Sequence, residues 1–251
     1  GGAYLLLRMS GRGTFRAAGP HEINAHGHAQ IFGWVGLFIM GFAYQAFPRL
    51  WQTTLAAPRL AAWAFAMMVA GLVARTVGTS AAGAWAFALP VAMLGGGLEV
   101  AAVLIFAGQV LATFARSGAR LEPSVGFMIG ALAWFVASSL MGVWHTWNSM
   151  TAQGTEALVW AIATYQAPLR DLQVHGLALF MILGVALRML PALFDLPRVP
   201  VRRAWWAFGL LIAAVASEVL LFLLYRWTHN HALAASLLLP RLLLTVGAAL
   251  V

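Results

Sequence analysis

Cysteine and lysine are absent from this 251-residue sequence, and charged residues make up only 9% of it. Without cysteine, the chain can form no disulfide, iron–sulfur cluster, thiolate copper site or covalently attached c-type haem. Any metal that it binds must therefore be held by histidine, carboxylate, methionine or backbone groups.

The few charges are unbalanced, because 15 arginines face 7 acidic residues and give a net charge of +8. The arginines stand singly or in pairs, mostly at the ends of apolar segments, where they anchor and orient membrane helices. This placement argues against nucleic acid as a partner. With 62% hydrophobic residues, the composition instead indicates an integral membrane protein that sits in a lipid bilayer.

Apolar segments long enough to cross a bilayer, which takes about 20 residues, recur along the chain. They predict an all-α fold, a polytopic transmembrane helical bundle that forms one domain over residues 1–251. The predicted spans are residues 24–47, 60–80, 84–115, 125–148, 169–194, 204–227 and 233–251. Pro90 and the glycines at 95–97 predict a kink in the third span, and residues 151–167 predict a polar loop. Both chain ends read as cut, so we expect a portion of a longer protein.

An internal repeat follows from two matching blocks. Residues 22–27 lie over residues 171–176 at an offset of 149, with every pair identical or chemically similar. After a loop shorter by six residues, Trp-Ala-Phe at 63–65 lies over the same tripeptide at 206–208. We therefore predict a duplication, with repeat one at about 22–150 and an incomplete repeat two at about 171–251. Four helices per repeat make the copies parallel, unlike the inverted repeats of many transporters.

The helix count places every histidine at or near one membrane face. These histidines are His21, His26, His28, His145, His175, His229 and His231. Because all seven histidines are expected at one of the two membrane faces, we predict a functional site at that face. The opposite loops carry slightly more arginine, so the positive-inside rule favours the periplasmic face of a bacterial inner membrane for the histidines.

Imidazole is the usual protein ligand of haem iron and a common ligand of copper. His26 and His175 are repeat-related and each precedes a glycine, so we predict that these two rings face each other across a b-type haem. His28 points away from His26, since successive helical residues turn by about 100°, and it suits either a different site or a supporting position behind the ligands.

The remaining histidines have two interpretations each. His28 and His145 are candidate ligands of a second metal, most plausibly copper, although the tryptophans beside His145 also suit an aromatic belt at the membrane interface. His229 and His231 are further candidate metal ligands or solvated loop residues.

Three other ionisable residues lie inside apolar segments, namely Glu99, Arg188 and Glu218. Arg188 and Glu218 are expected at similar depths in adjacent helices, which predicts a structural ion pair between them. Glu99 has no obvious partner, so it either serves a proton path or accepts a hydrogen bond from a neighbouring helix.

The segment His-Gly-His-Ala-Gln-Ile-Phe-Gly-Trp at 26–34 resembles the NnrS family, whose pattern is His-x-His followed by Phe-Gly and an aromatic residue. That resemblance implies a polytopic haem- and copper-containing membrane protein associated with the bacterial response to nitric oxide. The same spacing is similar to the low-spin haem helix of haem–copper oxidase subunit I, whose twelve helices form three four-helix arcs.

The chain departs from these patterns in two ways. Ala29 stands where the NnrS family usually has glutamate, and the adjacent histidines of an oxidase copper site are missing from the 251 residues. Reduction of oxygen or nitric oxide at a binuclear centre is therefore not predicted, and whether the chain is an enzyme stays open.

Three functions remain after these observations. The first is a b-type haem-binding membrane protein in electron transfer or nitric oxide response, working with a redox partner. The second is a non-catalytic helical subunit of a larger respiratory or photosynthetic complex. A transporter is the third and weakest, because the repeat is parallel and no broken helix pair is evident.

Overall fold

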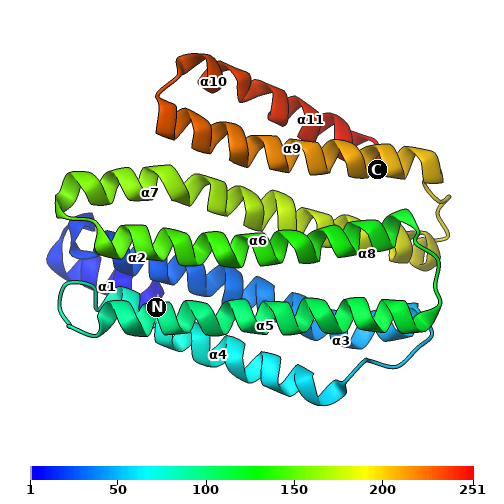
Figure 1. Ribbon diagram of the computed structural model, residues 1–251, viewed down its shortest axis with the longest axis horizontal. Coiled ribbons are helices and arrows are strands. Elements are labelled where there is room, and N and C mark those ends of the chain that lie inside the picture. The colour runs from blue at the N-terminus through cyan, green and yellow to red at the C-terminus, as the bar shows by residue number, and fades with distance from the viewer. Residues whose placement is uncertain (1) are drawn as a thin grey trace. The chain divides into compact units, whose positions relative to one another are not determined.

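The computed structural model describes residues 2–251, apart from the side chain of Arg16, and every element in that range is helical (Figure 1). Within those residues, seven helices are long and apolar enough to cross a membrane, which confirms the predicted number. They are Pro20–Leu50, Pro58–Ser80, Ala88–Ser117, Pro123–Thr151, Gly154–Phe194, Val201–Thr228 and His231–Ala249.

The chain divides into two compact units. Unit 1 contains Gly1–Arg116 and Gly142–Leu158. Its own helices are α1 (Gly2–Arg12), η1 (Phe15–Ala17), α2 (Pro20–His28), the π-helix η2 (Ala29–Gly36), α3 (Leu37–Leu50), α4 (Pro58–Ser80) and α5 (Ala88–Ser117). The end of α6 (Pro123–Thr151) and the start of α7 (Gly154–Asp171) also belong to it.

Unit 2 contains Ser117–Met141 and Val159–Val251, so it holds the rest of α6 and α7. The further helices are the π-helix η3 (Leu172–Ala178), α8 (Leu179–Phe194), α9 (Val201–Thr228), α10 (His231–Ser236) and α11 (Leu238–Ala249). Figure 1 shows α7, η3 and α8 as one continuous helical path.

One sequence prediction about helix limits is wrong. The predicted loop at 151–167 is mostly helix, because α7 begins at Gly154 and the fifth span then runs for 41 residues. The third span is one uninterrupted helix, α5, from Ala88 to Ser117, and the kink at Pro90 and the glycines stays a prediction. Pro90 falls in its first turn, where the missing N–H has no helical acceptor to lose.

Each unit has its own apolar core. In unit 1 the fully buried side chains include Phe32, Phe47 and Phe106. In unit 2, Phe127 and Phe180 pack with ring centroids 5.4 Å apart, and both rings also contact Phe208 at 5.3 and 6.0 Å. These aromatic contacts hold α6, α8 and α9 together.

Candidate functional site

A cluster of ionisable side chains lies inside unit 1, formed by His28 of α2, Arg75 of α4 and Glu99 of α5. The carboxylate of Glu99 lies 2.9 Å from Nε2 of His28 and accepts a hydrogen bond from Nη1 of Arg75 at 2.7 Å. Nη2 of Arg75 donates to the carbonyl oxygen of Gly142 at 2.5 Å and to Oγ1 of Thr146 at 2.7 Å, both on α6. The cluster therefore ties four helices together.

Close packing of α4 against α5 brings Arg75 and Glu99 within reach of each other. A Cβ added at Gly71 would lie 2.8 Å from the carbonyl oxygen of Gly95, and one added at Gly95 would lie 2.4 Å from the backbone nitrogen of Arg75. Contacts this short leave no room for a side chain, so both positions require glycine. The glycines thus determine the geometry of the cluster.

The cluster buries opposite charges side by side. The side chain of Arg75 is 5% exposed and that of Glu99 is 0% exposed. Ionised groups within membrane segments persist only when they are paired, and they commonly mark function. The ring of His28 stacks on Phe32 at a centroid distance of 4.5 Å, which holds it in place. The hydrogen-bonded interpretation of Glu99 is therefore confirmed, whereas its proton-path role stays a prediction.

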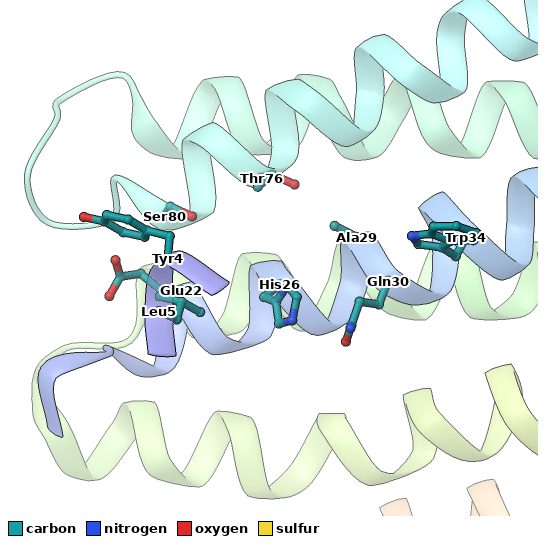
Figure 2. Close-up of a pocket in the computed structure, with 9 residues that line it drawn as sticks. All are labelled: Tyr4, Leu5, Glu22, His26, Ala29, Gln30, Trp34, Thr76 and Ser80. Atoms are coloured by element: carbon teal, nitrogen blue, oxygen red, sulfur yellow. The ribbon is translucent and has the colours of Figure 1, made fainter. Parts of the chain in front are cut away.

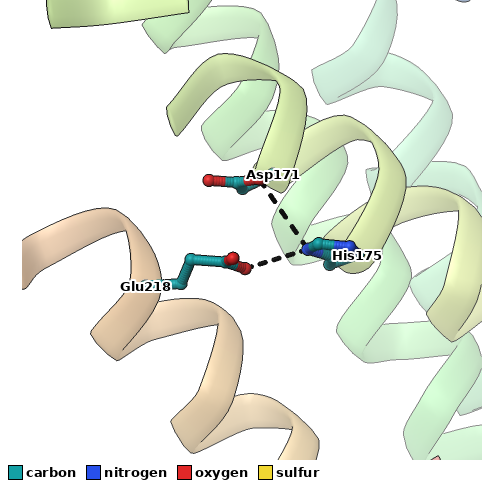
Figure 3. A group of neighbouring side chains, drawn as sticks. All are labelled: Asp171, His175 and Glu218. Carbon is teal, nitrogen blue, oxygen red and sulfur yellow. Dashed lines mark hydrogen bonds and ion pairs between the residues drawn. The ribbon is translucent and has the colours of Figure 1, made fainter. Parts of the chain in front are cut away.

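A second cluster of similar composition lies in unit 2. Nδ1 of His175, in η3, is 2.9 Å from the carboxylate of Glu218 on α9 and 3.8 Å from that of Asp171 (Figure 3). Nε of Arg241, on α11, is 2.7 Å from the other carboxylate oxygen of Glu218. Within residues 2–251, Asp171, His175 and Glu218 form the only group of three or more potential metal ligands of this kind.

The predicted ion pair between Arg188 and Glu218 is wrong. Nη1 of Arg188 instead donates to the carboxylate of Glu122 at 3.0 Å, and both side chains are well exposed. The fifth span begins at Gly154 rather than near residue 169, so His175, and not Arg188, lies beside Glu218. For the same reason His175 lies well inside its helix and not at the entrance.

The two clusters exchange the places of their charges. The offset of 143 residues that aligns Trp-Ala-Phe at 63–65 with 206–208 also places Arg75 over Glu218. In unit 1 the second span supplies the arginine and the third supplies the glutamate, whereas unit 2 has the reverse order. Burial matches at the same offset, since Ala64 and Ala207 are both fully buried.

His26 lies in a cavity of unit 1 with a volume of about 400 Å³ (Figure 2). Its polar lining is Tyr4, Glu22, His26, Gln30, Thr76 and Ser80, and the rest is Leu5, Ala29 and Trp34. Arg8 donates a hydrogen bond to the carboxylate of Glu22, and this bond raises the pKa of the Arg8 guanidinium.

The other predicted metal ligands differ in their burial. His145 of α6 is buried in unit 1. His229 caps the end of α9 with a positive φ of 54°, and His231 begins α10 with its ring centroid 6.5 Å from Tyr225; both are exposed. The metal-ligand predictions for these three residues and for His28 stay predictions.

Sequence reasoning missed Arg75, Asp171 and Arg241 as members of the clusters. One signal was present for Arg75, because an arginine inside an apolar span needs a buried acid, and Glu99 lacked an assigned partner. No family model, curated protein or solved structure matches this chain.

Proposed function

We propose that this chain is a b-type haem-binding integral membrane protein and that His175 is an axial ligand of the iron. The observation that carries the proposal is the 2.9 Å contact between Nδ1 of His175 and the carboxylate of Glu218. A histidine that ligates a metal usually gives its other ring N–H to a carboxylate, which fixes the tautomer and the ring orientation. With Nδ1 engaged in this way, Nε2 is the nitrogen for iron.

The charges around His175 suit an oriented imidazole better than a bare cation held by the carboxylates. Arg241 lies 2.7 Å from Glu218, and a guanidinium at that distance repels a second cation. His175 also lies in a π-helical turn, a feature that occurs frequently at functional sites. A bound haem supplies a redox centre, while the chain orients the ring and sets the charge beside it.

The resemblance of residues 26–34 to the NnrS family supports a role in electron transfer or nitric oxide response, in the manner of haem–copper oxidase subunit I. His26 remains the second predicted ligand. An added Cβ at Gly2 would lie 2.9 Å from its Nε2, so the backbone of α1 lies close to that nitrogen. The geometry around the two residues therefore favours His175.

An internal duplication is part of this proposal. A π-helical segment lies at or directly after a histidine in each unit, and it falls in the first predicted span of each repeat. Each unit also has a cluster of histidine, glutamate and arginine, although Arg241 is 66% exposed and Arg75 is buried. The π-helical segments support the repeat that residues 22–27 and 171–176 predict.

Membrane location and a second metal are proposed from sequence alone. We place the protein in a bacterial inner membrane, with the histidine-rich face in the periplasm. Copper at His28, His145, His229 or His231 is the corresponding proposal for the second metal.

A non-catalytic subunit of a larger membrane complex is the second candidate. The observation that favours it is charge balance, because Arg75 and Glu99 neutralise each other in unit 1, as do Arg241 and Glu218 in unit 2. Paired charges between helices are also what a purely structural clamp requires.

A pyridine-haemochrome spectrum of the purified protein tests the proposal. We expect a b-type spectrum from the parent chain and from His21→Ala, the control, and no haem in His175→Gly. Added imidazole should restore the haem spectrum of His175→Gly, which separates a lost ligand from a lost fold. A parent chain without haem, or full retention in His175→Gly without imidazole, would refute the proposal, and co-purification with a haem-bearing complex would then favour the scaffold.

A further inference from the structure

We propose that the cavity beside His26 binds the ring of a membrane-soluble quinone. The site lies wholly in unit 1 and involves neither His175 nor Glu218, so it does not depend on His175 as a haem ligand; it assigns His26 to the quinone instead of to the iron. Its volume of about 400 Å³ falls in the range of small-molecule sites.

Hydrogen-bond donors line the cavity from two helices. His26 and Gln30 are four residues apart on the first span, and Thr76 and Ser80 are four apart on α4, so each pair lies on one helix face (Figure 2). An imidazole N–H, an amide and two hydroxyl groups can all donate. A quinone carries two carbonyl oxygens, and donors from two helices match this arrangement.

The charges near the cavity argue against an anionic ligand. Glu22 is the only acid in the lining, and its carboxylate is already paired with Arg8. No unpaired cation lines the cavity in the part of the chain that the structure describes, so a phosphate or a carboxylate would find no counter-ion. A neutral head group that accepts hydrogen bonds is what remains.

One side of the cavity is aromatic and continues into an exposed apolar surface. Trp34 follows Gln30 by four residues and is 81% exposed, and Phe38 follows by four more and is 71% exposed. A flat indole provides a stacking surface for a planar ring. The ridge from Trp34 to Phe38 is an apolar path along which an isoprenoid tail can leave toward lipid.

Binding of decylubiquinone to the purified full chain in lipid nanodiscs tests this site, with equilibrium dialysis as the measurement. His26→Phe keeps a ring and removes the N–H, and Thr76→Val keeps the shape and removes a hydroxyl. We expect His26→Phe to weaken binding by about tenfold and Thr76→Val by a smaller factor. Thr79→Val, on the same helix but outside the lining, is the matched control and should bind like the parent.

The outcomes separate this proposal from the haem proposal. Decylubiquinone should bind His175→Gly as tightly as it binds the parent chain, whether or not haem is present. Non-saturable binding, equal affinity of His26→Phe, Thr76→Val and the parent, or complete displacement by phosphatidylglycerol would overturn the quinone site. Loss of haem with unchanged quinone affinity in His26→Phe would likewise overturn it, because His26 would then be a haem ligand.

Discussion

Replacing Glu99 with alanine removes the centre of the unit 1 cluster. Arg75 would keep its hydrogen bonds to Gly142 and Thr146, but its charge would lose its counter-ion while its side chain is only 5% exposed. Breaking a buried ion pair at one partner costs about 3–5 kcal/mol. Because two hydrogen bonds remain on the guanidinium, we expect the free energy of unfolding to fall by about 3 kcal/mol, at the lower end of that range.

The double variant Arg75→Met with Glu99→Leu separates the orphaned charge from the lost contacts. With both charges removed, apolar side chains fill the space between α4 and α5, and such replacements are often neutral or stabilising. We therefore expect the double variant to be more stable than Glu99→Ala by at least about 2 kcal/mol. The assay is unfolding of the purified protein by sodium dodecyl sulfate in mixed micelles, followed by circular dichroism at the helical band.

Glu122→Ala is the matched control, because its carboxylate pairs with Arg188 at a well-exposed position and should contribute less than about 1 kcal/mol. The reasoning fails if Glu99→Ala destabilises no more than Glu122→Ala. It also fails if the single effects at Arg75 and Glu99 simply add in the double variant.

Three further changes have defined outcomes. Gly95→Ala should destabilise by about 1–3 kcal/mol in the same unfolding assay, since its Cβ would meet the backbone of α4, whereas Gly97→Ala, which meets nothing within 4 Å, should not. If His175 ligates haem as we propose, Glu218→Gln should weaken haem affinity by about 10–100-fold in a haem titration, because the ring of His175 loses its carboxylate partner. Arg188→Ala should change the free energy of unfolding by less than about 1 kcal/mol, measured in the same micelles.

The number of membrane-length helices could be predicted because each is a long apolar run, and length identifies such runs. The start of α7 could not be predicted in the same way. Thr155, Glu156 and Gln166 make α7 polar enough to resemble a loop. Polarity measures preference for lipid, whereas helix formation depends on the backbone, and the intervening alanine and leucine residues favour a helix.

That boundary error explains the failed ion pair. We estimated how deep a residue lies in the membrane by counting from the start of its helix. Placing the start of the fifth span fifteen residues too late made Arg188, instead of His175, the expected partner of Glu218. Arg75 was overlooked because the sequence offered no partner for it. Its side chain is 5% exposed and donates hydrogen bonds to Gly142 and Thr146 of α6, which no local pattern reveals as acceptors.

The exchanged positions of arginine and glutamate indicate which contacts the two clusters share. If the two units descend from one ancestor, as we propose, Arg75 and Glu218 occupy equivalent positions with opposite charge, and each finds its complement on the following span. An electrostatic requirement for neutrality is satisfied by either order, since the pair energy depends on the product of the charges. A requirement to hold the histidine through a carboxylate is also met in both, because Glu99 contacts His28 and Glu218 contacts His175. The repeat aligns His175 with His26 rather than with His28, so the proposed duplication conserves neither the histidine position nor the arginine position. What recurs in both clusters is a carboxylate that contacts an imidazole and is balanced by an arginine.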